Sequence, residues 1–274
     1  MTTTPRPSRR LALALGGVSI AAVLAACSSD GDAGSEGGDD ILARIQESGT
    51  IRIGLEGTYR PYAFHDETGE LVGFEKEIAD KIADGLGVEP EYIETEWDSL
   101  IAGLDVDRYD LVLNNVGITP ERQEKYDFTE PYAQSIGRIA VPADSEVQTV
   151  EELEGKRSAQ TATSNWAQQM EALGAEIVPV QGFAEAIELV IQGRADATAN
   201  DFVSFQTYQE EHPDAAFRLL DAELPTDVTV GVIMQKDQEP LLAEVNRVLD
   251  ELKSDGSLTA IYEEWVGQDI TPEG

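Results

Sequence analysis

The feature that most constrains this fold is an alternation of short β-rich runs with amphipathic helical segments, which begins at residue 41. Apolar residues spaced by four, from Phe74 to Leu86, predict a helix that ends at Gly87. The run GTIRIGL, at 49–55, is β-rich and precedes it. Alternation of this length predicts open α/β sheets with parallel strands. In such sheets ligands bind where loops leave the carboxyl ends of the strands.

The same pattern predicts the remaining elements. Further strands are expected at 89–95, 109–115, 157–162, 175–180, 195–200 and 228–234. Further helices are expected at 41–48 with Asp39 or Asp40 as cap, at 98–104 with Asp98 as cap, at 166–173, at 184–192 and twice after 234. The first of the last two has an apolar stripe from Leu241 to Leu252.

The N-terminus has the form of an export signal. Its first ten residues are basic, and Leu11 to Ala26 form an apolar, small-residue stretch that is too short to span a bilayer comfortably. Residues 1–26 are therefore expected to be a signal peptide that is removed. The stretch LAAC spans the end of this segment and Cys27, the only cysteine of the chain. LAAC resembles the bacterial lipobox. Cys27 is expected to carry a lipid; the alternative is an ordinary signal peptide with a chance cysteine.

The residues after Cys27 predict a tether. Residues 27–40 are rich in Gly, Ser and Asp and cannot bury apolar surface, so we expect a flexible linker. Lipid, linker and body together predict a protein held on the extracellular face of a bacterial membrane.

Composition excludes several classes of protein. The chain has 53 Asp+Glu against 19 Lys+Arg, for a formal net charge of −34, which disfavours nucleic acid because phosphates are repelled. One cysteine allows no internal disulfide, and with only His65 and His212 we expect no metal site. The sequence has no nucleophile elbow, Walker loop, dinucleotide fingerprint or zinc-protease motif, so we expect no catalytic residues and no cofactor.

Polar residues that follow the expected strands predict a polar, hydrated cleft. It would hold one cation, Arg122, and the anions Asp201 and Glu56. Such a site suits a zwitterion, because the arginine fork binds a carboxylate and an aspartate accepts from an ammonium. Tyr59, Trp97 and Trp166 are candidates to wall the ligand side chain, although each could equally be a core residue.

Four stretches, at 49–79, 118–132, 153–169 and 192–202, are similar to the solute-binding proteins of bacterial ABC importers for polar amino acids. The resemblance covers the chain from residue 41 to its end. It implies a two-lobed periplasmic-binding-protein-like fold of type II, with two open sheets, two crossover strands and the ligand in the cleft. The first lobe is expected at 41–138 plus 231–274 and the second at 139–230, with crossings near Ile136–Val141 and Val228–Val232.

The resemblance also implies roles for residues. Arg122 matches the arginine that clamps the α-carboxylate, and Ser164 the hydroxyl that assists it at a helix start. Asp201 matches the acid that takes the α-ammonium, and Tyr59 the aromatic against the ligand. Many relatives carry a hydroxyl where this chain has Gly117. The expected ligand-binding residues are Glu56, Tyr59, Phe64, Trp97, Asn115, Gly117, Arg122, Thr161, Thr163, Ser164, Asn165 and Asp201.

The stretches LEGTY, ETEWDSL, SAQTATSNW and EEWVGQDIT are similar to the branch that binds L-cystine. This implies a monomeric receptor that captures L-cystine by lobe closure and delivers it to an ABC permease and its ATPase. Glu56 is then a candidate for the distal ammonium, with Trp97 or Phe64 over the disulfide. One alternative is that the same kind of importer receptor binds cysteine, glutamine or a cationic amino acid. Another is an enzyme similar to cyclohexadienyl dehydratase on the same fold. A sensory or adhesive lipoprotein is a further alternative.

Overall fold

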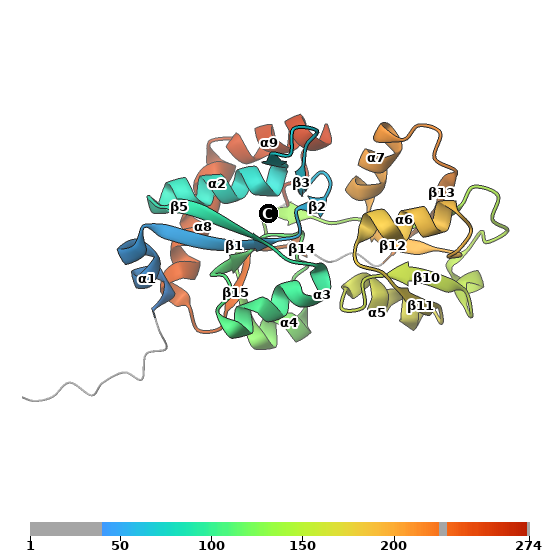
Figure 1. Ribbon diagram of the computed structural model, residues 1–274, viewed down its shortest axis with the longest axis horizontal. Coiled ribbons are helices and arrows are strands. Elements are labelled where there is room, and N and C mark those ends of the chain that lie inside the picture. Colours follow the sequence, from blue (N-terminus) through green and yellow to red (C-terminus); the bar gives the residue numbers. More distant parts are fainter. Residues whose placement is uncertain (1–39, 225–228, 273–274) are drawn as a thin grey trace, which may run out of the picture. The chain divides into compact units, whose positions relative to one another are not determined.

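A five-stranded sheet forms the centre of the first lobe in the computed structural model, which describes residues 40–224 and 229–272 (Figure 1). Its strand order is β5-β1-β6-β15-β7. The strands are β1 (Thr50–Leu55), β5 (Glu89–Glu94), β6 (Leu111–Val112), β7 (Tyr126–Phe128) and β15 (Ile233–Gln235). Strand β1 is parallel to β5 and β6, whereas β15 is antiparallel to β6 and β7. The C-terminal part of the chain therefore returns to complete this sheet.

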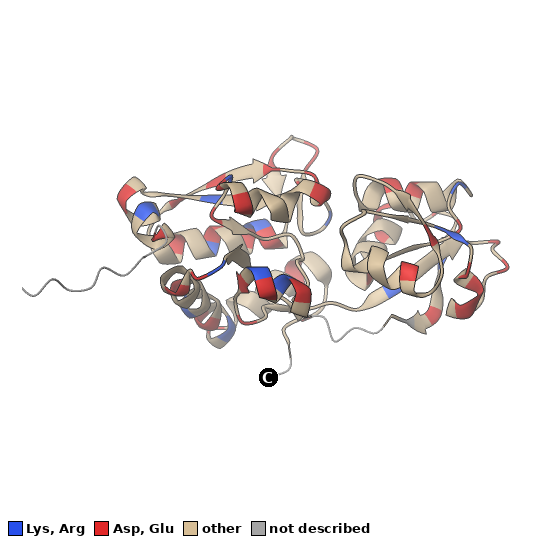
Figure 2. Ribbon diagram, turned by 90° about the horizontal axis from the view of Figure 1, so that it is seen from below, with Lys and Arg blue, Asp and Glu red and all other residues tan. Residues whose placement is uncertain are grey.

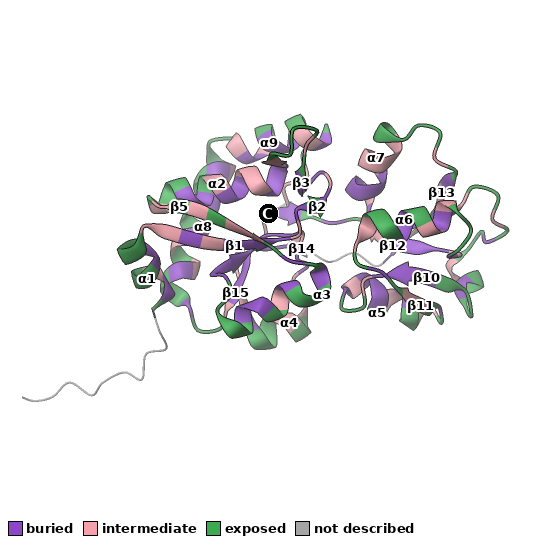
Figure 3. Cartoon of the chain, in the orientation of Figure 1, coloured by how far each residue is buried: buried purple, intermediate pink, exposed green. Residues whose placement is uncertain are grey.

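Helices cover both faces of this sheet. They are α1 (Ile41–Ser48), α2 (Phe74–Leu86), α8 (Glu239–Ser254) and α9 (Ser257–Val266) around one core, and α3 (Trp97–Leu100) and a 3₁₀ helix (Ile101–Val106) around the other. Helix α4 (Pro120–Lys125) has no buried residue and precedes β7. The first core joins Ile53 of β1 to Ile78 of α2 and Leu249 of α8, all fully buried. Figure 3 shows that α2 and α8 have buried inner faces and exposed outer faces, as their apolar spacing requires.

The middle of the chain forms the second lobe. Strands β9 (Gly137–Pro142), β12 (Thr198–Asp201) and β13 (Phe217–Glu223) form an antiparallel sheet, and β10 (Arg157–Gln160) is parallel to β11 (Glu176–Pro179). A bridge from Ser158 to Ala197 joins the two groups. The helices are α5 (Asn165–Ala172), α6 (Phe183–Ile191), α7 (Phe202–Glu211) and a 3₁₀ helix (Val150–Leu153). Two further cores, one around Trp166 and one around Phe205, hold these elements together.

Two short strands, β8 (Ala133–Gln134) and β14 (Thr229–Val230), pair where the chain passes between the two sheets. A small meander of β2 (Thr58–Tyr59), β3 (Ala63–His65) and β4 (Leu71–Val72) follows β1. The residue bounds expected for the two lobes stay a prediction. Figure 2 shows Asp and Glu spread over many elements, as the net charge requires.

The structure confirms most of the expected elements and corrects three expectations. Helix α1 begins after Asp40, whose side chain accepts from the Ala43 N–H, and α2 ends at Gly87 as expected. Asp98 does not cap its helix, because α3 begins earlier, at Trp97. The strand expected at 109–115 is only two residues long. The sheet β12-β9-β13 is antiparallel, since alternating burial alone does not set strand direction. The expected signal peptide, Cys27 and the linker up to residue 39 lie outside the described residues.

Candidate functional site

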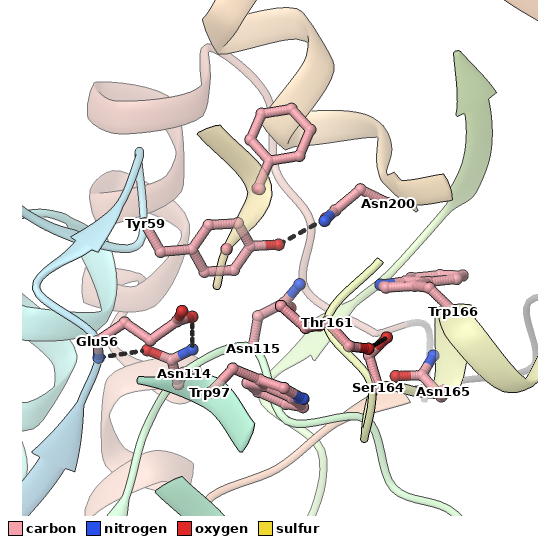
Figure 4. Close-up of a pocket in the computed structure, with 12 residues that line it drawn as sticks. Glu56, Tyr59, Trp97, Asn114, Asn115, Thr161, Ser164, Asn165, Trp166 and Asn200 are labelled. Atoms are coloured by element: carbon pink, nitrogen blue, oxygen red, sulfur yellow. Dashed lines mark hydrogen bonds between the residues drawn. The ribbon is translucent and has the colours of Figure 1, made fainter. Parts of the chain in front are cut away.

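A cavity of 40 Å³ lies between loops of the two lobes (Figure 4). Its lining residues are Glu56, Tyr59, Trp97, Asn114, Asn115, Thr161, Ser164, Asn165, Trp166, Gly182, Phe183 and Asn200. Most of them directly follow β1, β6 and β10 or begin α3, α5 and α6. This is the carboxyl edge of parallel strands, where open α/β sheets bind ligands.

One end of the cavity is acidic. The backbone N–H of Glu56 donates to Asn114 Oδ1 at 2.8 Å, and Asn114 Nδ2 donates back to Glu56 Oε2 at 2.6 Å. The two residues are brought together because β1 and β6 are parallel neighbours. Burial raises the pKa of Glu56 to about 7, against the opposing effect of the Asn114 hydrogen bond. The fully buried amide therefore fixes a carboxylate that titrates near neutral pH at the cavity wall.

Tyr59 connects the two lobes across the cavity. Its hydroxyl donates to Asn200 Oδ1 at 2.6 Å and accepts from Ser204 Oγ at 3.0 Å. Its ring stacks on Tyr62, with the ring centroids 4.3 Å apart. Burial raises the pKa of Tyr59 well above its ordinary value, so the hydroxyl remains protonated. The Tyr59 ring is thus held in place at the cavity, and its hydroxyl hydrogen-bonds to residues of the second lobe.

A buried carboxylate lies directly behind the cavity. Both oxygens of Glu75 accept from the backbone N–H of Asn115, at 2.8 and 2.9 Å, and Tyr132 donates its hydroxyl to the same carboxylate. Asn115 has φ of 51°, in the left-handed region that few residues other than glycine adopt. Glu75 therefore holds the cavity-lining residue Asn115 in a backbone conformation that a free loop would rarely keep.

Glu75 is expected to make the free energy of unfolding fall as the pH rises. Burial raises its pKa from an ordinary 4.5 to about 7, so the folded state holds this proton more tightly than the unfolded state. The stability that protonation provides is full below the unfolded pKa and is lost as the pH rises through the folded pKa, by up to about 3 kcal/mol. Urea unfolding at a series of pH values should show a shallower decline for Glu75→Gln than for the parent.

Glu70→Gln, an exposed change of the same type in the preceding turn, is the control for this experiment. It should leave the pH slope of the parent unchanged. An equal slope in parent and Glu75→Gln would show that Glu75 does not take up this proton.

The opposite end of the site carries hydrogen-bond donors. Arg122 lies at a second cavity, of 310 Å³, which shares Trp97 and Asn165 with the first. Its Nη1 donates to the Gly117 carbonyl at 2.9 Å, and its Cζ lies 5.4 Å from the Trp97 ring centroid. Burial lowers the pKa of Arg122 to about 10, which leaves it cationic at neutral pH. Within the described residues no carboxylate forms an ion pair with it.

Ser164 and Thr163 lie at the start of α5. The Ser164 hydroxyl accepts from the Ala167 N–H at 3.1 Å and donates to the Thr161 carbonyl at 2.9 Å, so it caps the helix. Asp98, from the first lobe, accepts from both the backbone N–H and the hydroxyl of Thr163, at 2.9 Å each. Asp98, which the sequence predicts as a helix cap, therefore links the two lobes.

The structure brings seven of the twelve expected ligand-binding residues to the first cavity. These are Glu56, Tyr59, Trp97, Asn115, Thr161, Ser164 and Asn165. Arg122 and Thr163 line the second cavity instead. Gly117 bridges to Val230 and offers its carbonyl to Arg122. Phe64 lies elsewhere, between the Arg60 guanidinium, 3.9 Å from its ring centroid, and the Trp265 ring.

Asp201 does not line either cavity. It is 2% exposed, accepts from the Ser135 hydroxyl and caps α7 through the Val203 N–H at 2.9 Å. Asn200, the preceding residue of β12, faces the cavity instead, because successive strand residues point to opposite faces.

Five cavity residues were outside the expected set. They are Asn114, Trp166, Gly182, Phe183 and Asn200. Trp166 was predictable from the sequence, because an aromatic residue beside the polar start of a helix is a candidate to line the ligand side chain. Asn114 and Asn200 each adjoin an expected residue. Asn114 lines the cavity together with its neighbour Asn115, whereas in β12 the pleat of the strand turns Asn200 rather than Asp201 toward the cavity. Gly182 and Phe183 had no local signal that we can identify.

A two-sheet α/β fold with a polar cavity between its lobes defines a periplasmic-binding-protein-like fold of type II. The family model for bacterial extracellular solute-binding proteins, family 3, matches residues 51–268. The chain therefore belongs to this family of solute-binding proteins.

Individual relatives agree with this assignment. The chain is similar to a probable amino-acid ABC transporter-binding protein of Haemophilus influenzae, with 40% identity over 85% of this chain and 90% of the relative. It is 34% identical to the L-cystine-binding protein TcyA of Bacillus subtilis, over 93% of this chain and 96% of TcyA. Among solved structures, the L-cystine solute receptor of Neisseria gonorrhoeae in its unliganded open conformation gives a TM-score of 0.58 at 37% identity, covering 85% of this chain and 99% of the receptor.

The described residues contain no membrane-spanning helix and no cluster suited to a metal ion. No helix among them has the length and apolar character needed to cross a bilayer. No group of three or more His, Cys, Asp or Glu side chains within residues 40–224 and 229–272 is placed to hold a metal ion.

Proposed function

We propose that this protein is the amino-acid receptor of an ABC importer and that it works by closing its two lobes over the ligand. The observation that carries the proposal is a polar cavity whose walls come from both lobes. Contacts such as Tyr59–Asn200 and Asp98–Thr163 already join the lobes around it. A ligand that bridges the same walls binds the closed state better and shifts the population toward it. No bond of the ligand is made or broken.

The ligand head is proposed to be a zwitterion. Arg122 provides a cationic fork without a carboxylate partner in the described part of the chain, and the N-terminus of α5 adds backbone donors beside it. Asp201 is proposed for the ammonium, as the family resemblance implies. To reach it, the ligand must displace the Ser135 hydroxyl from the carboxylate.

The proposed ligand is L-cystine. Two of the relatives described above carry that ligand in their names. A further cavity of 240 Å³ shares Glu56, Tyr59, Gly182 and Phe183 with the first, and it gives room for a second amino-acid head. Its other walls include Glu96 and Glu185, and none of the described residues that line it is a Lys or Arg. A distal ammonium is favoured there, and a distal carboxylate alone, as in glutamate, is disfavoured.

Calorimetric titration of a soluble protein that begins near Asp39 tests the proposal. Bound ligand is first removed by unfolding and refolding, and L-cystine is compared with L-cysteine, L-glutamine, L-glutamate, L-arginine and D-cystine. Selective binding of L-cystine supports the proposal. Preference for L-arginine would keep the receptor and identify a cationic amino acid, which the same acidic cavity also suits. No binding across the panel would favour the enzyme or sensory alternatives.

Glu56→Gln is expected to weaken L-cystine binding by about ten- to a hundred-fold, because a charge-assisted hydrogen bond to the distal ammonium is lost. The affinity of the parent should also rise with pH through about 7, since the ammonium binds the ionised carboxylate and expels its proton. Titration in buffers of different ionisation enthalpy measures the proton released. Glu91→Gln, on an exposed position of β5, is the matched control.

The receptor is further proposed to be a monomer held on the outer face of the membrane by a lipid on Cys27, with residues 1–26 removed. LAAC before the only cysteine supports this. A Cys27→Ala protein expressed in a bacterial host should leave the membrane fraction, and the parent should carry a diacylglyceryl group by mass spectrometry. An unmodified parent would contradict the anchor without affecting the binding site.

A further inference from the structure

The part of the chain that the structure describes gives the Trp97 indole N–H no hydrogen-bond acceptor. The residue is 8% exposed, and its Nε1 is buried without a hydrogen-bond partner within the described residues. Among residues 40–224 and 229–272, no other residue with such an orphaned side-chain atom lines the 40 Å³ cavity or the 310 Å³ cavity. A buried donor without a partner is destabilising, and most native proteins avoid it. Trp97 lines both cavities, so a ligand bound there is a candidate for the missing acceptor.

The indole ring is held in place by the fold. Trp97 begins α3, and its backbone hydrogen-bonds to Glu56. Its ring packs in the same core as Leu100, Leu104 and Val116. A ring fixed in this way loses little conformational freedom when it accepts a ligand. The N–H direction is consequently set before the ligand arrives.

The groups around the Trp97 indole indicate which kind of acceptor suits its N–H. Figure 4 shows the Trp97 nitrogen at the end of the ring nearer to Ser164. The Arg122 guanidinium lies over the same ring, and α5 begins at Asn165. An indole N–H can only donate, and these neighbours add a cation and a helix N-terminus, where Asp98 already accepts from the Thr163 N–H and hydroxyl. Donors that converge in this way suit an anionic oxygen, and a carboxylate gives the stronger, charge-assisted hydrogen bond.

We propose that the indole N–H of Trp97 donates a hydrogen bond to a carboxylate oxygen of the bound amino acid. Trp97 is then a directional ligand contact as well as an aromatic wall. This inference rests on the proposed amino-acid binding function. It adds a directional contact to the ring's packing, so the loss of the N–H alone should weaken binding.

The test replaces the donor while keeping the shape of the ring. Benzothienylalanine, in which sulfur replaces the indole N–H, is introduced at position 97 by amber suppression, and L-cystine binding is measured by calorimetry. We expect about ten- to a hundred-fold weaker binding, the effect of losing a hydrogen bond to a charged group. Trp97→Phe should be weakened at least as much. The same replacement at Trp265, whose Nε1 donates to Glu77 at 3.0 Å outside the site, should leave the affinity unchanged.

A second measurement uses the unaltered protein, so it does not depend on the folding of any variant. The indole ¹H–¹⁵N resonance of Trp97, assigned by its absence in Trp97→Phe, should move downfield and exchange more slowly with water when L-cystine is added. Parent-like affinity in the benzothienyl variant, or an indole resonance unchanged at saturation, would overturn the proposal for Trp97 alone. Failure of the parent to bind any ligand of the panel would instead refute the receptor function, and this proposal with it.

Discussion

Arg122→Ala is expected to reduce amino-acid affinity by at least a hundred-fold, to below the range that calorimetry measures. The guanidinium is cationic, half-buried and without a carboxylate partner in the described residues, so a ligand carboxylate would be its first ion pair. Removing one member of a desolvated, hydrogen-bonded charge pair costs about 2–5 kcal/mol or more. Titration with the amino acid selected by the panel measures the loss.

Two controls separate this effect from unfolding and from net charge. Arg122→Lys keeps the charge but loses the planar fork, so its affinity should fall between those of the parent and the alanine variant. Lys81→Ala removes an equal charge from an exposed position of α2 and should bind normally. The thermal unfolding of Arg122→Ala should resemble that of the parent. Near-normal binding by a folded Arg122→Ala protein would refute the proposed carboxylate clamp.

Gly73→Ala is expected to lower the free energy of unfolding by about 4 kcal/mol, the combined cost of backbone strain and steric overlap. Gly73 has φ of 127° and ψ of 160°, a conformation that is essentially restricted to glycine. A Cβ there would overlap the Tyr62 carbonyl oxygen and lie 2.7 Å from its carbonyl carbon. The approach is this close because the Pro61 and Tyr62 carbonyls accept from the first N–H groups of α2, at 3.0 Å each.

Gly69→Ala separates these two causes. Gly69 also has a positive φ, of 84°, but a Cβ there would meet nothing within 4 Å. It should therefore cost only about 1 kcal/mol, the strain of a non-glycine residue in the left-handed region. Chemical denaturation of both variants and the parent measures the difference. Equal losses at the two positions would contradict the steric argument at Gly73.

Local hydrophobic periodicity predicts many of the helices and strands of the fold. Helix α2 was predictable because one apolar stripe repeats every four residues and Gly87 ends it. Helix α7 was not, because Val203, Ser204 and Phe205 are buried consecutively and give no helical period. Strand β13 was likewise missed. It lies beside β9 by non-local pairing, which no pattern within its own residues specifies.

The sequence by itself determined the type of site: polar residues at strand ends, one candidate cation in Arg122 and a family resemblance through nearly the whole body. Only the tertiary structure decided which neighbour faces the cavity. Asn200 reaches Tyr59 while Asp201 turns to Ser135, because adjacent strand residues point to opposite faces and a pattern of polar residues does not fix the register. The Glu75–Asn115 and Glu56–Asn114 pairs join residues that are 40 and 58 positions apart in the chain. Such contacts exist only once β1, β6 and α2 have packed together, so local sequence could not reveal them.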